Sequence, residues 1–358
     1  MLAVGGFATT ALSRAAARPR AVRAPRAVSA SAPGAGTGGG RFAKRECGRG
    51  DRVVARGKKE DAAKRALMGA LGGSADILKE NDGDGSQRDM LACLELNPDQ
   101  HYELAAYCRE CGIDFLSTAF GLNELELLLD LKIRAIKVPS GEITHRPLLE
   151  AMATNAANGQ LPVYLSTGMS TLGEVEAALE IFLKAGLSRD SITLLHCLSA
   201  YPAPEGEINL RAISTLASAF GCPVGYSDHT LGITAPVAAV ALGAVVIEKH
   251  LTLDCGMEGP DHRASLEPDQ FAAMVQGIRG IERALGDGLK RPTASERVNL
   301  PIVRKSIVAA RTIQEGEVFS AWNITAKRPG TGISPMHWDE LLGRTASRAY
   351  SPDELIEW

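Results

Sequence analysis

Short apolar runs alternate with amphipathic helical patterns along the chain from residue 115 to about residue 285. Each run is rich in β-branched or aromatic residues and closes on a polar residue, as buried strands do. The polar residues that close successive runs are 22 to 33 residues apart, which is the length of one βα unit. The six runs are Phe115–Thr118, Ala135–Ser140, Val163–Thr167, Ile192–Ser199, Val224–Asp228 and Val245–His250. This alternation predicts an α/β fold with a parallel sheet and right-handed crossovers.

An open doubly wound sheet and a closed barrel both satisfy the alternation. The polar residues stand at the carboxyl end of every predicted strand. A barrel gathers active-site groups there from many strands, whereas an open sheet concentrates them at one switch point. The pattern therefore favours a TIM-type (β/α)8 barrel. Because only six runs are found, we expect its first two βα units to be missing.

Two histidines close the last two predicted strands. His229 follows Val224–Asp228, and His250 ends Val245–His250, so adjacent strands would bring both imidazoles to one rim. The pair predicts a divalent metal site; the alternative is two imidazoles held by core hydrogen bonds. His196 lies at an odd offset from Ser199 in its strand, so we expect it on the opposite face in a structural role.

The pattern changes after residue 290. Short β-prone pieces replace the βα units at Ser306–Ala310, Val318–Phe319 and Ile324–Lys327. We therefore divide the chain into an unassigned and mostly disordered segment at 1–85, a partial barrel at 86–290 and a small β-rich domain at 297–358. Seven scattered cysteines do not indicate a disulfide framework, and the Cys108–Cys111 CxxC lies in a helical pattern with no second pair.

The charge of −3 is unevenly distributed. Residues 1–60 carry ten Arg and three Lys against three acids, a formal charge of +10, which leaves −13 for the rest. The net negative charge of residues 61–358 argues against nucleic-acid binding. No apolar run in the sequence is long enough for a membrane span. The first 45 residues have no Asp or Glu and are rich in Ala and Arg, which is typical of an organelle transit peptide. That predicts a plastid or mitochondrial protein; a disordered tail or a misplaced start would instead leave it cytoplasmic.

Several motifs together resemble the bacterial type of the N-acetylneuraminate (sialic acid) synthase family. The resemblance runs from about Ser86 to the C-terminus. It is carried by Lys137-Val-Pro-Ser-Gly-Glu142, Leu165-Ser-Thr-Gly-Met169, Leu195-His-Cys-Leu-Ser-Ala-Tyr-Pro-Ala-Pro204, Gly225-Tyr-Ser-Asp-His-Thr230, Glu248-Lys-His-Leu-Thr-Leu-Asp254 and Gly259-Pro-Asp-His-Arg-Ala-Ser265. It implies a barrel followed by an antifreeze-like domain, in a domain-swapped homodimer. It also implies condensation of phosphoenolpyruvate with an N-acetylmannosamine-type sugar, release of phosphate, and a divalent metal, Mn²⁺ or Mg²⁺.

The resemblance also assigns roles to individual residues. His229 and His250 would hold the metal, and Glu142 and Lys137 would be catalytic. Some family members have Asn at the position of Ser199. Any one of the Ser or Thr hydroxyls named below could also cap a helix or a turn. The expected phosphoenolpyruvate contacts are Thr118, Lys137, Ser140, Ser166, Ser199 and Ser227, and the expected sugar contacts are Tyr201, Asp261 and, from the partner subunit, Arg328. Glu248 and Lys249 are either an ion pair that supports His250 or simple strand-end charges.

The chain departs from the family at its front. Complete members carry a Glu after the first strand and a Lys-x-Gln after the second, and neither motif is found here. The chain is thus either an enzyme with a truncated or wrongly predicted N-terminus, or an inactive relative that acts as a binding or partner subunit; ice binding has only the name of the antifreeze-like domain in its favour. The acceptor stays open among N-acetylmannosamine, its 6-phosphate, mannose and diacetamido sugars.

Overall fold

The computed structural model describes residues 2–5, 8–14, 96–257 and 261–358 of the 358-residue chain. The chain divides into two compact units, Met1–Leu285 and Gly286–Trp358, and each is described by itself. Most of the Arg-rich leader lies outside the described residues.

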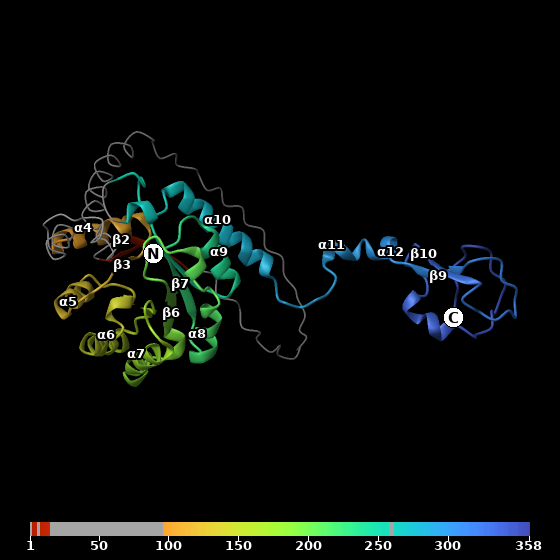
Figure 1. The fold of residues 1–358 in the computed structure, drawn as a ribbon, viewed down its shortest axis with the longest axis horizontal. Helices are drawn as coiled ribbons and strands as arrows, with labels where there is room; N and C mark the ends of the chain where they lie inside the picture. Colours follow the sequence, from red (N-terminus) through yellow and green to blue (C-terminus); the bar gives the residue numbers. More distant parts are fainter. Residues whose placement is uncertain (1, 6–7, 15–95, 258–260) are drawn as a thin grey trace, which may run out of the picture. The chain divides into compact units, whose positions relative to one another are not determined.

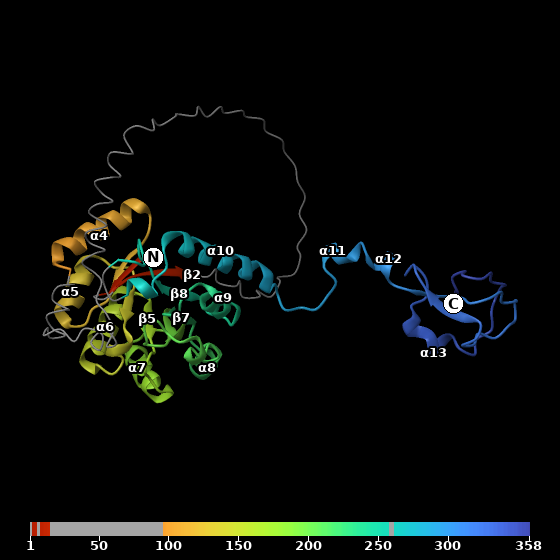
Figure 2. The ribbon, with the colours of Figure 1, turned by 45° about the horizontal axis from the view of Figure 1, so that its top comes forward.

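Six parallel strands, each followed by a helix, build the first unit. This arrangement confirms the predicted βα alternation, and the helices surround the strands as a ring (Figures 1 and 2). The helix α4 (Pro98–Cys111) precedes the first of these strands. The strands are β3 (Phe115–Ser117), β4 (Ile136–Val138), β5 (Val163–Ser166), β6 (Ile192–Cys197), β7 (Val224–Asp228) and β8 (Val246–His250). The helices that follow them are α5 (Leu122–Asp130), α6 (Arg146–Gly159), α7 (Leu172–Lys184), α8 (Ala212–Phe220), α9 (Thr234–Ala241) and α10 (Pro268–Leu285).

Two strands from the start of the chain complete the sheet. The strand β2 (Ala8–Arg14) pairs antiparallel with β8, and β1 (Leu2–Gly5) pairs antiparallel with β2 and parallel with β3. A parallel bridge between Thr118 and Lys137 joins β3 to β4, so the eight strands form a closed circuit.

Part of the segment at 1–85 belongs to the sheet. Residues 2–5 and 8–14 are strands, although they fall in the segment that we expected to be mostly disordered. They fill the sheet positions of the two missing βα units, but as an antiparallel pair. The physical reason is that β3 and β8 would otherwise expose unpaired backbone groups along both edges. The Arg- and Ala-rich composition of the leader gives no signal for these two strands.

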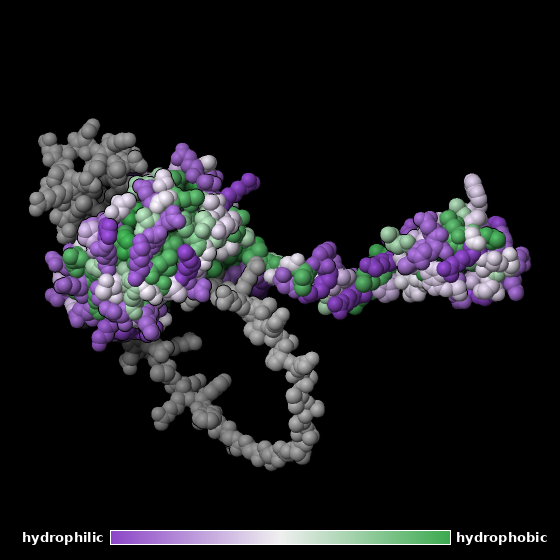
Figure 3. Space-filling view, turned by 90° about the horizontal axis from the view of Figure 1, so that it is seen from below, coloured by the Kyte–Doolittle hydropathy of each residue, from purple (hydrophilic) through white to green (hydrophobic). Residues whose placement is uncertain are grey.

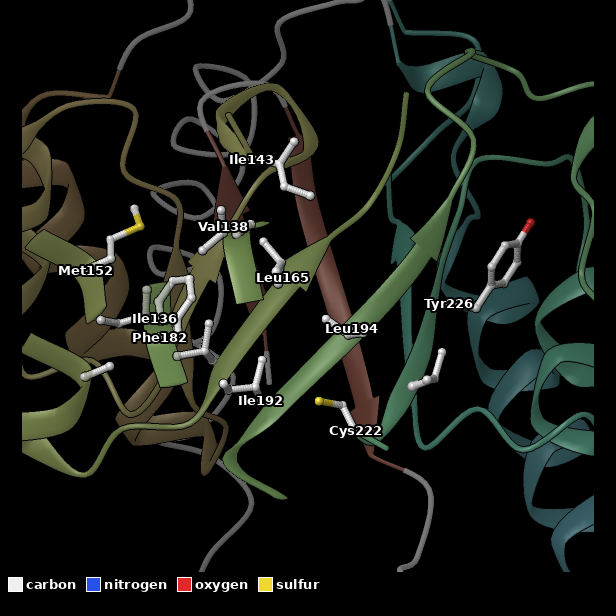
Figure 4. Close-up of a cluster of buried hydrophobic side chains, with 14 of the residues drawn as sticks. Ile136, Val138, Ile143, Met152, Leu165, Phe182, Ile192, Leu194, Cys222 and Tyr226 are labelled. Carbon is white, nitrogen blue, oxygen red and sulfur yellow. The ribbon is translucent and has the colours of Figure 1, made fainter. Parts of the chain in front are cut away.

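Alternate residues of the six parallel strands face two different cores. One face packs against the helices, with Ile136, Leu165, Leu194 and Tyr226 on the strands meeting side chains such as Phe182 from α7 (Figure 4). The other face fills the barrel with a smaller apolar cluster. The period of two thus separates a large outer core from an inner layer that continues upward into the candidate site.

Capping residues explain where two helices begin. Thr171 accepts a hydrogen bond from the Glu174 amide, and the Glu174 carboxylate accepts one from the Thr171 amide, which is a capping box at the start of α7. Asn97 and Gln100 form the same motif at the start of α4, and Gly112 ends that helix with φ of 71°. Short 3₁₀ turns connect other elements, at Ser140–Glu142, Arg189–Ser191, Glu205–Glu207 and His262–Ala264.

The second unit is small and rich in β structure, as expected. Its two-stranded antiparallel sheet pairs β9 (Ser306–Ala309) with β10 (Ile324–Lys327) around a core that includes Ile307, Phe319 and Tyr350. The helices α11 (Ala294–Arg297) and α12 (Leu300–Val303) precede the sheet. The turn Pro335–His337 and α13 (Trp338–Leu341) follow it.

The surface mixes residue types. The face of the first unit shown in Figure 3 carries hydrophilic residues with hydrophobic ones between them. None of the helices among the described residues is both long and apolar enough to cross a membrane.

Candidate functional site at the carboxyl ends of the strands

The barrel interior changes from apolar to polar within two residues along each strand. The inner apolar cluster consists of Leu116, Ala135, Tyr164, Leu195 and Val246, with Val245 packed against it. Two positions farther along the same strands, on the same face, the chain places Thr118, Lys137, Ser166, Cys197 and Glu248, and Ser227 stands at the matching position of β7. The polar residues at the strand ends therefore form one layer at the carboxyl mouth of the barrel, where active sites of this fold lie.

Lys137 is the centre of this polar layer. Its Nζ donates to Ser166 Oγ at 2.6 Å and lies 3.7 Å from Glu248 Oε2. Ser227 Oγ in turn donates to Glu248 Oε1 at 2.7 Å. All four side chains are buried, so β4, β5, β7 and β8 hold a cation, an anion and two hydroxyls in one water-poor space.

A second cluster of small polar groups lies beside β6. Ser140 Oγ accepts a hydrogen bond from the Gly168 amide at 3.0 Å and is 3.3 Å from Cys197 Sγ, which is 3.8 Å from Ser199 Oγ. A Cβ atom on Gly168 would lie 2.4 Å from Ser199 Oγ and 2.7 Å from both Ser140 Oγ and Cys197 Sγ. The close approach of the β5–α7 loop to β6 therefore requires glycine at this position.

The two histidines meet at the mouth of the barrel. Their ring centroids are 5.1 Å apart with the planes nearly perpendicular, and the Tyr201 ring covers them at 4.2 Å from His229 and 5.5 Å from His250. His229 Nδ1 is 2.7 Å from the carbonyl oxygen of Leu198. A proton on Nδ1 satisfies that carbonyl and leaves the Nε2 lone pair of His229 free for a ligand.

His250 lies beside a buried carboxyl group. Its Nδ1 has no hydrogen-bond partner and is 3.8 Å from Asp261 Oδ2, while Asp261 Oδ1 is buried without a partner. Burial raises the pKa of Asp261 to about 7. Burial also lowers the pKa of both imidazoles, and the neighbouring His229 lowers that of His250 further. Both shifts favour the neutral imidazole, which is the form that binds metals.

These features fit a divalent metal with few protein ligands. A fixed tautomer on one imidazole and an unsatisfied buried nitrogen on the other leave each ring with capacity for a metal bond. Among the described residues, no group of three or more His, Cys, Asp or Glu is placed to hold a metal ion. The fit therefore rests on the two imidazoles.

Other predicted residues fall in different places. Glu142 lies in the turn after β4, about one-fifth exposed, and its Oε2 is 2.6 Å from His145 Nδ1. Arg328 belongs to the second unit, where its Nε donates to the carbonyl oxygen of Val303. His196 is on the helix-facing side, with Nε2 2.7 Å from the Ile208 carbonyl oxygen and its ring stacked on Tyr226, which confirms its structural placement.

Part of the polar layer is not predicted from the sequence. Cys197 was not singled out, although it shares the inner face with Lys137 and Ser227. Glu248 and Lys249 do not pair with each other: Glu248 points inward to Lys137, and Lys249 pairs with Asp228 on the other face. The period of two, counted from Ser227, is the sequence signal that separates them.

Taken together, the barrel, the inward polar layer and the imidazole pair define a β/α-barrel enzyme with a candidate active site at the carboxyl ends of its strands. The chain belongs to the NeuB family, whose model matches residues 65–290, and it carries an SAF domain at residues 304–358. These matches confirm the family that the motifs indicated and the C-terminal domain. Several of its relatives are named as synthases, and this chain is a synthase-type enzyme.

The relatives cover most of the chain. It is 50% identical over 279 residues to the N,N'-diacetyllegionaminic acid synthase of Campylobacter jejuni, covering 78% of this chain and 82% of that protein. It is 38% identical over 267 residues to human N-acetylneuraminate-9-phosphate synthase, with 74% and 72% covered.

Solved structures agree on the fold. The putative spore coat polysaccharide biosynthesis protein E of Chromobacterium violaceum superposes with a TM-score of 0.63 at 25% identity, covering 79% of this chain and 83% of that one. The N-acetylneuraminic acid synthetase of Leptospira borgpetersenii, solved with citrate, gives a TM-score of 0.56 at 33% identity, with 70% and 85% covered.

Proposed function

We propose that this chain condenses phosphoenolpyruvate with a mannose-type amino sugar to give a nonulosonic acid and phosphate. Carbon 3 of the enol phosphate forms a bond to the aldehyde carbon of the open-chain sugar. Water adds to carbon 2, and the bond from carbon 2 to the phosphate oxygen breaks. The observation that carries the proposal is the placement of Lys137 and its hydroxyl partners in the same barrel mouth as the two neutral imidazoles.

The polar layer supplies the phosphoenolpyruvate pocket in this proposal. Lys137 exchanges its bond to Ser166 for bonds to the phosphate or carboxylate, because an anion is a stronger acceptor than a hydroxyl. The predicted contacts at Thr118, Ser140, Ser199 and Ser227 add donors around it. The loop after Ser166 leads into the N-terminus of α7, whose peptide dipoles also favour an anion.

The acceptor sugar would lie toward the histidines. His229 and His250 would hold Mn²⁺ or Mg²⁺, which when bound supplies Lewis-acid polarisation of the aldehyde oxygen. Tyr201 and Asp261, which contact or adjoin these rings, are then placed to bind sugar hydroxyls. Glu142 is proposed to position water or move a proton, with His145 orienting its carboxylate.

The acceptor is first tested among N-acetylated sugars. The chain is 50% identical to a diacetyllegionaminic acid synthase and 38% identical to the human N-acetylneuraminate-9-phosphate synthase. The higher identity favours a diacetamido mannose-type sugar as the acceptor over N-acetylmannosamine or its 6-phosphate. Purified protein is incubated with phosphoenolpyruvate, Mn²⁺ and each sugar, and released phosphate and the acid product are measured by mass spectrometry. A His229→Ala/His250→Ala variant serves as the control and is expected to release no phosphate.

An inactive partner subunit remains the second candidate. The observation that favours it is the antiparallel pair β1 and β2, which stands where a complete member has two βα units with a Glu and a Lys-x-Gln. Folded protein that releases no phosphate with any of the sugars, in the presence of Mn²⁺, would support this candidate and refute the enzyme proposal.

A domain-swapped homodimer is proposed from the second unit. Val298, Ile302 and Val303, in and beside α11 and α12, are each more than half exposed. A row of exposed aliphatic residues is usually covered by a partner. In such a dimer Arg328 would reach the sugar site of the other subunit. Light scattering is expected to give twice the monomer mass; a monomer at micromolar concentration would contradict the swap.

The cellular compartment is also a proposal. If residues 1–45 direct import, the protein works in a plastid or mitochondrion, and otherwise in the cytoplasm. The pairing of residues 2–4 with β3 and of residues 10–14 with β8 favours the second case, because a cleaved leader would remove both strands from the sheet. Fusing residues 1–60 to a fluorescent protein distinguishes the two by its location.

A further inference from the structure

A fully buried ion pair stands directly behind the two histidines. Lys249 Nζ donates to Asp228 Oδ2 at 2.7 Å, and both side chains are 0% exposed. Asp228 precedes His229 and Lys249 precedes His250. By the alternation of the strands, the ion pair lies on the helix-facing side, together with Tyr226 and Ile247, while the imidazoles lie on the inner side.

Stability alone does not account for charges at this position. The layer around them is apolar, and removing two charges from water costs about as much as their attraction returns. A pair of apolar residues of similar size would stabilise such a layer at least as well. The role of the Asp228–Lys249 pair is therefore sought in its hydrogen bonds to neighbouring residues.

Those contacts fix the backbone on the far side of His229. Asp228 Oδ1 accepts from the Thr230 amide at 2.9 Å, and Lys249 Nζ donates to the Thr230 carbonyl oxygen. Asp228 and Lys249 are also the last register partners of β7 and β8, so no ladder pairing follows them in that strand pair. The side chains of the pair thus continue the link between the two strands past the end of the ladder, where His229 is attached.

We infer that the Asp228–Lys249 pair is a positioning device that holds His229 and His250 at the separation and orientation needed to share one divalent metal. The inference rests on the proposed metal role of these imidazoles. Residues that orient metal ligands without touching the metal commonly set affinity by roughly 10- to 100-fold. Asp228 and Lys249 act through the backbone of both ligands, so their loss is expected to weaken metal binding and leave the anion pocket at Lys137 intact.

The test replaces both charges at once. In the Asp228→Val/Lys249→Met variant neither charge is left unpaired, so the fold is expected to survive, whereas Lys249→Met alone strands a buried carboxylate and lowers the unfolding temperature. Mn²⁺ binding is measured by the paramagnetic resonance signal of free Mn²⁺. The dissociation constant of the double variant is expected to rise roughly 10- to 100-fold. Its phosphate release should recover at high Mn²⁺, with an unchanged KM for phosphoenolpyruvate.

Two further variants keep the test decisive. Leu179→Ala opens a cavity in α7 away from the histidines and is expected to lower stability without changing Mn²⁺ affinity. Tyr226→Phe removes the hydroxyl that hydrogen-bonds Asp228. It keeps both charges, so it is expected to fold even if the double variant does not, and to weaken Mn²⁺ binding by less than the double variant would.

The outcomes separate the two proposals. Wild-type affinity for Mn²⁺ in folded double variant and in Tyr226→Phe would overturn the positioning role and leave the metal site intact. Mn²⁺ binding by His229→Ala/His250→Ala equal to that of the wild type would overturn the metal role, and the positioning role with it.

Discussion

Replacing Gly168 by Ala tests whether the small polar cluster beside β6 belongs to the substrate pocket. The added Cβ would lie 2.4 Å from Ser199 Oγ and 2.7 Å from Ser140 Oγ and Cys197 Sγ. Non-bonded heavy atoms are comfortable at about 3.5–4.0 Å, so three side chains must each move by roughly 1 Å or rotate. Rotation of Ser140 would also break its bond to the Gly168 amide.

The size of the effect follows from this crowding. Overpacking of a buried site costs about 1–3 kcal/mol. For a unit of this size that corresponds to a fall of roughly 2–12 °C in the unfolding temperature. If the displaced hydroxyls bind phosphoenolpyruvate, a similar free energy is lost from substrate binding, and kcat/KM for phosphoenolpyruvate falls roughly 5- to 150-fold. Metal affinity should not change, because neither histidine is touched.

The assay measures phosphate release against phosphoenolpyruvate concentration, together with thermal unfolding. Gly280→Ala is the matched control: it lies within α10 with nothing within 4 Å of the added Cβ, so it is expected to stabilise the helix by about 0.5–1 kcal/mol without affecting kinetics. Combining Gly168→Ala with Ser199→Ala removes the closest clash and should restore part of the lost stability. A Gly168→Ala protein with wild-type kcat/KM and a lowered unfolding temperature would refute the placement of this cluster in the pocket.

Three further predictions concern single groups. Lys137→Met should raise the KM for phosphoenolpyruvate roughly 10- to 100-fold, since hydrogen bonds from a charged donor contribute about 1.5–3 kcal/mol; an unchanged KM in steady-state assays would contradict it. Burial lowers the pKa of His196 below 6.5, so the folded protein favours the neutral ring. The contribution of this ring to the free energy of unfolding is therefore present above pH 6.5 and is lost as the pH falls. Thermal unfolding between pH 7 and 5 should therefore show a smaller decline in His196→Gln than in the wild type, and equal declines would count against this. Burial raises the pKa of Cys108 to about 11, while Cys111 is exposed. Iodoacetamide at pH 8 should therefore label Cys111 before Cys108 in a mass-spectrometric time course, and the reverse order would be inconsistent with the structure.

The sequence predicted the barrel because its signals are local. Each strand from β3 to β8 is a short apolar run with a turn or cap at its end, and such signals need no knowledge of distant residues. The closure of the sheet is different. The pairing of β2 with β8 joins residues more than two hundred positions apart, and nothing in the sequence of residues 8–14 indicates which strand they pair with. Composition alone therefore assigned this segment to a disordered leader.

The candidate site divides in the same way. His229 and His250 were predicted from their places at strand ends and Lys137 from the family resemblance, and the structure brings the two histidines together. The partners of these residues were not predicted, because side-chain pairing depends on register between strands. From the sequence, Glu248 is either an ion-pair partner of Lys249 or a simple strand-end charge. In the structure its partners come from β4 and β7, which only the register of three strands reveals.

Register also explains why the buried ion pair and the candidate site depend on each other. In β7 and β8 the inner face carries Ser227 and Glu248, and the outer face carries Asp228 and Lys249. A slip of one residue in β8 would move Lys249 into the barrel and Glu248 to the helices, and Asp228 would face the apolar layer without a cation. An uncompensated buried charge is strongly destabilising, so the pair disfavours that register. The same slip would turn His250 away from His229. The charges that are costly to bury therefore disfavour the one-residue slip that would turn an imidazole away from the mouth of the barrel.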